Sequence, residues 1–480
     1  MLYVSSLFLA FLAGLTLLYY VLPRRTQPYL LLVANLCFYA FAGPRALLYL
    51  LLLSLLSFFF ALAIGQETAL RRRKIWLCSY LVLGLGALVY AKFSLYLLRS
   101  LHLYFGLPLF TVPVLVPLGL SFFTLQAVAY VVDVYRQKIQ ATKNPIKFML
   151  FMSYFPIIVQ GPISRWDELS EQLWAKHPFD YTQVKQGALL LLWGFFKKLV
   201  IANRAASFAD PIFASYERYS GFMVMMGILL YTLQIYADFS GAVDICRGAS
   251  EMLDIKIRNN FDHPYFATSV KDFWRRWHIS LSLWLRDYVY IPLGGNRRGR
   301  WRKHLNVFLT FLVSGLWHGV GFHYICWGGY HGLCQVLGDL LREPKDRLIK
   351  AVGLRSGAFS FRLGQQICTF ILIAYSWLLF RANGLRAALH MTRSLFGTFY
   401  QKTLYMEVFP DGRELVVLML ATLLLFTVSC FQQKRALRDV LERQNLWFRW
   451  TVYLLLLFGS IIFGVYGQGY NASDFLYMQF

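Results

Sequence analysis

Three histidines stand in an otherwise apolar stretch, and they are the residues of this chain best suited to acid–base chemistry. The stretch covers residues 314–332, SGLWHGVGFHYICWGGYHG, and contains His318, His323 and His331 without any carboxylate. A histidine in a low-dielectric pocket loses the hydration that stabilises its charged form, so it is neutral near pH 7. One ring nitrogen is then free to accept a proton, as a general base acting on a hydroxyl requires.

Each of these histidines also has a structural explanation. For His318 the alternative to catalysis is a neutral ring bonded to a backbone carbonyl, and its position in the sequence does not separate the two. His323 and His331 neighbour aromatic and glycine residues, so packing explains them better than catalysis does. The three have neither the i, i+4 spacing of a helical zinc site nor a nearby glutamate. We therefore predict no metal site.

Several other reaction types lack their usual residues. The chain has no GxSxG elbow, no Walker loop and no paired carboxylates inside apolar runs, which argues against a serine hydrolase, an ATPase and a proton-coupled carrier. One acidic segment, YADFSGAVD, places Asp238, Ser240 and Asp244 at the end of an apolar run. These residues suit either a helix terminus at the membrane interface or the ion ligands of a transporter.

The elements that must position these side chains are membrane helices. Of the 480 residues 58% are hydrophobic and 15% are charged, against roughly 25% charged residues in soluble domains. Some apolar runs reach the roughly 20 residues that a helix needs to cross a bilayer, and others are short enough to be re-entrant. The runs are continuous, which favours helices over a β-barrel. They lie at about residues 5–22, 28–43, 46–64, 75–98, 108–132, 187–201, 221–237, 304–317, 324–341, 364–380, 414–431 and 447–467.

The distribution of charge predicts an orientation in the membrane. The net charge of +24 is spread over clusters at helix ends, and loops rich in Lys and Arg stay cytoplasmic. The first six residues and the last stretch, GQGYNASDFLYMQF, have neither residue, so both termini are predicted to be extracytoplasmic. Charge spread in this way, without a nucleic-acid motif, argues against nucleic-acid binding. The clusters are residues 24–25, 71–74, 136–147, 297–303, 342–362 and 434–443.

The flanks of the histidine stretch predict a hairpin. If the basic clusters at 297–303 and 342–362 are both cytoplasmic, the chain leaves and returns within residues 304–340. Two crossings at roughly 20 residues each plus a turn need more than that, so the hairpin is predicted to turn at depth, near Trp317 and His318. Gly315, Gly319, Gly321 and Gly332 permit close backbone approach there. Ionisable residues held inside a membrane are functional candidates.

A second unusual segment combines aromatic and charged residues. A capping-box-like start at Ser269 and Asp272 predicts a helix that ends before Pro292. Trp274, Trp277 and Trp284 follow at helical spacing and give it one aromatic face. Such a helix suits the headgroup region, and this anchoring would explain His278 without a catalytic role.

The remaining organisation predicts one polytopic domain over residues 1–480. Residues 161–187 are amphipathic and are expected to lie along an interface. The seven cysteines form no CxxC pair, so we expect free buried thiols.

Six segments form an ordered set of motifs between about residues 117 and 332. They are PLGLSFFTLQAVAYVVDVYR, YFPIIVQGPISR, WGFFKKLVIAN, YADFSGAVD, FWRRWHISLSLWLRDYVYIPLGGNRRG, and SGLWHG followed by CWGGYHG. Together they resemble the membrane-bound O-acyltransferase family, and within it the bacterial branch that includes the membrane subunit of alginate O-acetylation. The FWRRWHISLS and WHG blocks are specific, whereas GPISR alone is weak.

This resemblance implies a fold and two site residues. The fold is an all-α polytopic membrane protein with roughly 11–14 transmembrane, re-entrant and interfacial helices in a ring around a thin central region, with residues 117–332 as the motif-bearing core. His318 matches the family's membrane-embedded catalytic histidine, and His278 matches a second histidine of the bacterial branch. Related sequences usually have a polar or aromatic pair where Ala242 and Val243 stand here.

The resemblance also implies the reaction. An acyl group, acetyl in the simplest case, passes from a cytoplasmic thioester, acetyl-coenzyme A, to an extracytoplasmic hydroxyl, with no permanently bound cofactor. Asp238, Ser240 and Asp244 would support the site, and Trp317 would contact the donor. Arginines match phosphate geometry, although membrane topology explains them equally well. The arginines in question are Arg275, Arg276, Arg297, Arg298, Arg300 and Arg302.

The expected partners follow from the same resemblance. Besides membrane lipid, we expect an extracytoplasmic SGNH-hydrolase-like partner and a polysaccharide as final acceptor, with the chain in a bacterial inner membrane. The alternative within the class is transfer of D-alanine from a carrier protein to teichoic acid. The alternatives of another class are a non-enzymatic lipid or polysaccharide transporter and a scaffold for the partner.

Overall fold

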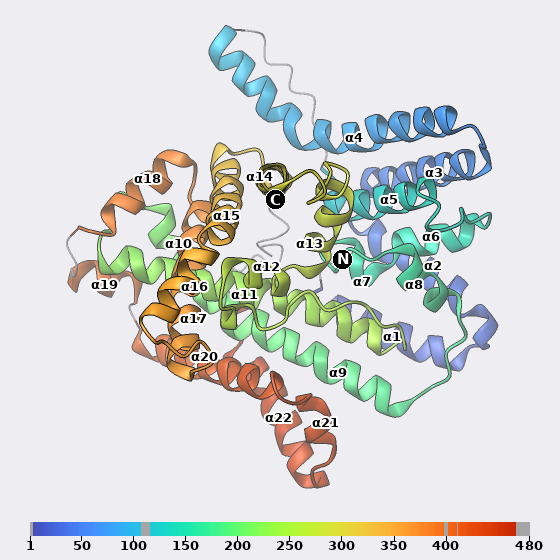
Figure 1. The fold of residues 1–480 in the computed structure, drawn as a ribbon. Coiled ribbons are helices and arrows are strands. Elements are labelled where there is room, and N and C mark those ends of the chain that lie inside the picture. The colour runs from blue at the N-terminus through green and yellow to red at the C-terminus, as the bar shows by residue number, and fades with distance from the viewer. Residues whose placement is uncertain (1–2, 107–115, 398–401, 410, 467–480) are drawn as a thin grey trace. The chain divides into compact units, whose positions relative to one another are not determined.

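The computed structural model describes residues 3–106, 116–397, 402–409 and 411–466, and these are helical almost throughout (Figure 1). Six of the described helices are long and apolar enough to cross a membrane, while others are shorter apolar helices. The expectation of an all-α membrane protein with spanning and shorter helices is thereby confirmed. The six candidate spans are Pro44–Gln66, Leu70–Leu103, Phe222–Glu251, Phe359–Arg381, Gly412–Gln432 and Leu446–Phe463.

The described residues divide into two compact units. The first contains residues 3–106, 116–191 and 242–258, and the second contains residues 192–241, 259–397, 402–409 and 411–466. The C-terminal stretch GQGYNASDFLYMQF, on which the predicted side of the C-terminus depends, lies outside the described residues. Both units are stabilised by buried polar contacts as well as by apolar packing.

In the first unit, α5 lies at the centre of the packing. Every residue of α5 from Leu120 to Val134 is buried, and α3 packs against α4, α5 and α6; Figure 1 shows α3 and α5 side by side. The helices of this unit are α1 (Ser6–Val21), η1 (Arg24–Thr26), α2 (Gln27–Ala40), α3 (Pro44–Gln66), α4 (Leu70–Phe105), α5 (Leu120–Tyr135), α6 (Pro145–Ser153), α7 (Phe155–Ile158), α8 (Trp166–Trp174), most of α9 (Tyr181–Phe195) and the end of α11 (Phe222–Glu251).

In the second unit, α15 is packed against α14, α12 and α17. Arg204 connects its own helix, α10, to α20 and α22. Its guanidinium donates to the Glu414 carboxylate at 2.6 Å and to the Phe463 carbonyl at 2.8 Å. The helices are the start of α11, η2 (Phe196–Ala202), α10 (Asn203–Ala214), η3 (Pro264–Phe266), α12 (Val270–Arg276), α13 (Ile279–Leu285), η4 (Arg286–Tyr290), α14 (Arg300–His318), α15 (Phe322–Leu340), α16 (Arg342–Ala351), α17 (Phe359–Arg381), α18 (Leu385–Ser394), α19 (Lys402–Val408), α20 (Gly412–Gln432), α21 (Leu437–Glu442) and α22 (Leu446–Phe463).

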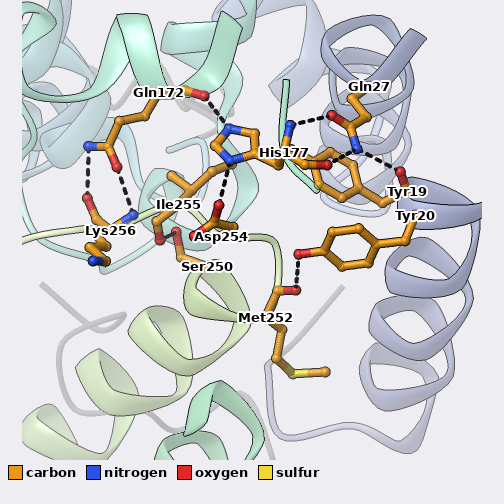
Figure 2. Close-up of polar contacts among 10 residues, drawn as sticks. All are labelled: Tyr19, Tyr20, Gln27, Gln172, His177, Ser250, Met252, Asp254, Ile255 and Lys256. Atoms are coloured by element: carbon orange, nitrogen blue, oxygen red, sulfur yellow. Dashed lines mark hydrogen bonds and ion pairs between the residues drawn. The ribbon is translucent and has the colours of Figure 1, made fainter. Parts of the chain in front are cut away.

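A polar network holds the segment after α8 in the first unit (Figure 2). The Gln27 amide accepts from the His177 backbone N–H at 2.9 Å and donates to the carbonyls of Tyr19 and His177 at 3.0 and 2.9 Å. The His177 ring nitrogens lie 3.0 Å from the Asp254 carboxylate and 2.8 Å from the Gln172 carbonyl. Both contacts are made to oxygen atoms, one at each nitrogen of the ring. The network fixes the segment between α8 and α9 to the start of α2.

Replacing Gln27 with leucine is expected to destabilise the protein without touching the chemistry. Gln27 is 1% exposed, and its loss leaves three buried backbone groups without partners. Each unsatisfied group costs about 1 to 3 kcal/mol, so three such groups predict a loss of at least about 3 kcal/mol and a melting temperature several degrees lower.

Thermal melting in detergent, followed by size-exclusion chromatography, measures this change. The matched control is Gln444→Leu, because the exposed Gln444 amide donates only to the Val440 carbonyl of its own segment. Equal melting temperatures for both variants would show that the network contributes little.

Candidate functional site

His318 lies at the end of a helical hairpin. It is the last residue of α14, the turn follows at Gly319, and α15 begins at Phe322. The side chain is buried, with 2% of the residue exposed. The predicted hairpin with its turn beside Trp317 and His318 is confirmed, and its depth in the bilayer stays a prediction.

Glycine is required where the two helices of the hairpin meet. A Cβ atom at Gly315 would overlap the carbonyl oxygen of Tyr324, and one at Gly328 would overlap the carbonyl oxygen of Phe311. The two backbones therefore approach as closely as in small-residue contacts between membrane helices. Gly332 similarly packs on Phe308. This contact places His318 at a defined point beside α15, and Gly328 is a residue that the sequence reasoning missed.

Aromatic rings enclose the histidines of the hairpin. The His318 ring has its centroid 4.7 Å from that of Trp317, 5.1 Å from Trp327 and 5.2 Å from Phe380. His331 is fully buried and its Nδ1 accepts a hydrogen bond from the Trp274 indole N–H at 3.2 Å. This hydrogen bond supports the structural role expected for His331. His323 is half-buried at the start of α15.

His278 stands at a break that the sequence did not predict. The expected single helix is two seven-residue helices, α12 and α13, and His278 between them has a left-handed backbone with φ +45° and ψ +54°. A residue with a Cβ pays roughly 1 to 2 kcal/mol for this conformation, which persists only where the surroundings impose it. The predicted cap at Ser269 is confirmed, since its hydroxyl accepts from the Asp272 N–H at 3.1 Å.

The aromatic face of α12 and α13 is inside the protein. Trp274, Trp277 and Trp284 are 8%, 1% and 8% exposed, so the expectation that they anchor a helix among lipid headgroups is wrong. The tryptophan spacing is the same for a face buried in protein and for one in the headgroup region. Of the two neighbouring arginines, Arg275 is exposed, and Arg276 pairs with Asp272 at 3.0 Å.

One tryptophan contacts both candidate histidines. The Trp317 ring centroid lies 6.0 Å from that of His278 and 4.7 Å from that of His318. Phe239 of α11 lies against His278 from another side, at 4.8 Å. His278 from one motif, and Trp317 and His318 from another, are thus brought to one aromatic cluster of the second unit.

The residues on either side of Phe239 bind buried lysines. Asp238 forms an ion pair with Lys198 at 2.5 Å, and Lys197 donates to the Ser240 hydroxyl at 3.0 Å. All four are at most 4% exposed, and breaking a buried pair by removing one partner costs about 3 to 5 kcal/mol. Both lysines belong to the π-helix η2, a geometry common near functional sites.

The two lysines were not predicted as site residues, although the pair interrupts an apolar run. The third candidate of this segment, Asp244, lies in the part of α11 that belongs to the first unit, 3.5 Å from Arg247.

A cationic pocket lies at the opposite end of α14 from His318. It encloses about 510 Å³ and is lined by Asn296, Gly299, Arg300, Lys303, Asp339, Arg342 and Glu343. Lys303 and the His304 imidazole donate to Asp339 at 2.7 and 2.8 Å. These hydrogen bonds lower the pKa of Asp339 to about 2. The predicted donor residues Arg297 and Arg298 are exposed in the same loop but do not line the pocket.

Comparisons with known proteins identify the family of the chain. Residues 120–347 match the membrane-bound O-acyltransferase family. The chain is 34% identical to the probable alginate O-acetylase AlgI of Pseudomonas putida, with all of both chains covered. It is 33% identical to the peptidoglycan O-acetyltransferase of Helicobacter pylori, over 76% of this chain and 73% of that protein. A teichoic acid D-alanyltransferase of Bacillus subtilis is 28% identical over 45% of this chain and 57% of its own length.

The chain belongs to the membrane-bound O-acyltransferase family. It is a multi-pass membrane enzyme, and the relatives that match most of its length are O-acetylases and O-acetyltransferases of polysaccharides.

Replacing Gly328 with alanine is expected to force α14 and α15 apart. The added methyl meets backbone rather than a side chain that could rotate away, so we expect a loss of at least about 1 to 3 kcal/mol and reduced acyl transfer as His318 shifts. Melting temperature and donor turnover measure the two effects.

The matched control is on the same helix. A Cβ at Gly338 meets nothing within 4 Å, so Gly338→Ala should keep activity and gain up to about 1 kcal/mol of helix propensity. Wild-type stability and activity in Gly328→Ala would contradict the close packing described for the hairpin.

Proposed function

We propose that this enzyme takes an acetyl group from acetyl-coenzyme A on the cytoplasmic side of a bacterial inner membrane and delivers it across the membrane for O-acetylation of an extracytoplasmic polysaccharide. The observation that carries the proposal is the hairpin itself, with the buried His318 at one end of α14 and a cationic pocket at the other. The similarity to alginate and peptidoglycan O-acetylating enzymes supports the acyl group and the acceptor class.

His318 is the proposed base for the acyl transfer. Its imidazole accepts the proton of the acceptor hydroxyl while the hydroxyl oxygen forms a bond to the thioester carbonyl carbon. The carbon–sulfur bond then breaks, and the imidazolium returns the proton to the leaving thiolate. The products are an oxygen ester and a free thiol, and no other reactant is consumed. General base catalysis of this kind contributes about 10²- to 10⁴-fold to a rate.

The proposed role of His278 is to donate a hydrogen bond to the thioester carbonyl oxygen. Its ring meets the same Trp317 that contacts His318, so both imidazoles belong to one aromatic cluster. A hydrogen bond donated to the developing oxyanion by a fixed group contributes roughly 3 to 4 kcal/mol. Trp317 shapes the space in which the thioester is attacked.

The pocket of Arg300, Lys303 and Arg342 is the proposed site for the donor's phosphates. α14 has 19 residues, which at about 1.5 Å each places this pocket roughly 28 Å from His318. A donor with phosphates at one end and a thioester at the end of a long arm would cover part of this separation, and the long side chains of Arg300 and Lys303 would cover the rest. Asp339 fixes Lys303 in the pocket through the 2.7 Å bond. Arg275, Arg297 and Arg298 add positive potential around the entrance.

The far side of the membrane supplies the acceptor in this proposal. The basic clusters at helix ends support a cytoplasmic position for the pocket. A separate extracytoplasmic hydrolase-like protein, of the SGNH type, passes the acetyl group to the polysaccharide. Similarity to a teichoic acid D-alanyltransferase makes D-alanyl transfer from a carrier protein the competing donor assignment.

The first test is consumption of radiolabelled acetyl-coenzyme A by purified protein in liposomes. We expect His318→Ala to lower turnover by at least about 100-fold, because the base is removed. His278→Ala should lower it by about 100- to 1,000-fold, the usual effect of removing an oxyanion donor. His323→Ala, at the same turn, is the matched control and should retain most of its turnover.

Three results would contradict this assignment. Wild-type turnover in a well-folded His318→Ala would exclude the proposed base. Consumption of a D-alanyl carrier protein in place of acetyl-coenzyme A would replace the donor, and silence with both donors would favour a scaffold or transporter.

The second test concerns the cationic pocket. Arg300→Gln and Arg342→Gln remove charges that bind the donor equally in its ground and transition states, so we expect KM for acetyl-coenzyme A to rise about tenfold with kcat little changed. Added salt should weaken donor binding by the wild type more than by the variant that carries both substitutions, because that variant has lost the charges that salt screens.

Arg355→Gln is the control for loss of surface charge, since Arg355 is exposed and outside the pocket. The same KM in all three variants would show that the donor's phosphates bind elsewhere.

A further inference from the structure

The first turn of α13, which follows His278, needs hydrogen-bond acceptors from outside the helix. His278 is the N-cap residue of α13, but its side chain makes no capping hydrogen bond to that helix. The ring instead lies against Phe239 and Trp317. An N-cap side chain normally accepts from the free N–H groups of the first turn. Because the His278 side chain does not accept from the first N–H groups of α13, another residue must do so.

Asn260 is that residue. Its backbone carbonyl accepts from the Ile279 N–H at 3.1 Å, and its side-chain Oδ1 accepts from the Ser280 N–H at 2.9 Å. Asn260 is fully buried. The first two N–H groups of α13 are therefore capped by a residue that lies outside the helix, on the segment before η3.

Neighbouring contacts hold this segment in register with the turn. Phe261 and Trp277 form an antiparallel bridge, and the Asp262 N–H donates to the Arg276 carbonyl at 2.9 Å. Together with the two Asn260 hydrogen bonds, these contacts hold the backbone on both sides of His278. This over-determined geometry explains how a non-glycine residue is kept in the left-handed region.

We propose that Asn260 is a positioning residue for acyl transfer, which caps α13 from outside and so holds the turn that carries the His278 imidazole. The inference rests on the proposed role of His278. Asn260 acts through the backbone of residues 279 and 280, and it makes its contribution with an acceptor oxygen. Its Nδ2 has no hydrogen-bond partner among the described residues, so the donor half of the amide is not part of the cap.

Two substitutions separate the acceptor from the rest of the side chain. Asn260→Ala removes Oδ1, and we expect kcat to fall by about 100-fold with KM little changed, since a misplacement of about 1 Å at a reacting group has an effect of this size. Asn260→Asp keeps an acceptor oxygen facing the start of a helix, where negative charge is favourable. It should keep turnover within about threefold of wild type.

The neighbouring residue gives a matched control. Asn259 is exposed, and its side chain bonds only to the backbone of Phe261. Asn259→Ala should therefore turn over the donor at the wild-type rate. A loss as large as that of Asn260→Ala would show that any disturbance of this segment has the same effect.

The test for action through His278 is a double-mutant cycle. In a His278→Ala background, where radiolabelled donor still measures the residual rate, Asn260→Ala should lower turnover by less than about threefold. A full 100-fold loss in both backgrounds would mean that Asn260 acts independently of His278, and the proposal would be wrong. A loss in Asn260→Asp equal to that in Asn260→Ala would likewise overturn the acceptor role.

A second measurement does not depend on activity. Diethyl pyrocarbonate modifies accessible neutral imidazoles, and peptide mass spectrometry reports each histidine separately. His278 is 1% exposed in the wild type, so we expect slow modification there and in Asn260→Asp, and modification several-fold faster in Asn260→Ala. His331, fully buried and bonded to Trp274, is the internal reference and should stay protected in every variant.

The two measurements distinguish the inference from the proposed function. Absence of donor turnover in the wild type contradicts the proposed function, while His278 labelling still decides whether Asn260 positions the ring. Wild-type turnover combined with unchanged turnover and unchanged labelling in Asn260→Ala overturns the inference and leaves the proposed function in place.

Discussion

The close contact of α14 with α15 is the constraint on which the site depends. At Gly315 and Gly328 the backbone of one helix faces a carbonyl of the other, and no side chain fits between them. Lipid tails are as apolar as leucine side chains, so there is little hydrophobic driving force between helices in a membrane. Van der Waals contact between small residues therefore holds such helices together. The hairpin can then place His318 beside Trp327 and α17 without a long loop.

The second histidine reaches the same cluster by a different physical route. His278 is held by hydrogen bonds from a distant segment and by a strained backbone, rather than by close helix packing. The buried pairs of Lys198 with Asp238 and Lys197 with Ser240 stiffen α11 on either side of Phe239, which contacts His278. Buried ion pairs are poor sources of stability but fix geometry when all their members are satisfied. The arrangement suits an enzyme whose two imidazoles must keep a constant separation.

The features of the fold that depend on local sequence could be predicted, and those that depend on distant partners could not. Basic clusters and the shortness of residues 304–340 were enough to predict the hairpin and its turn, and the Ser269 cap followed from its spacing to Asp272. The break at His278 was missed because its cause, Asn260, lies outside the helix. The tryptophan face was placed in the headgroup region because spacing does not distinguish lipid from protein as a neighbour. Arg300 of the pocket was among the arginines named from the sequence, but Lys303 and Arg342 were missed, because Arg342 joins Arg300 only through the return of α15.

A structure with a bound thioether analogue of acetyl-coenzyme A, determined by cryo-electron microscopy, would show where the donor's phosphates and acyl group bind. The account predicts the phosphates against Arg300, Lys303 and Arg342, with the arm along α14 and the acyl carbonyl within hydrogen-bond distance of the His278 or His318 imidazole. An analogue whose acyl end lies away from both histidines, with its phosphates outside the pocket, would contradict the account.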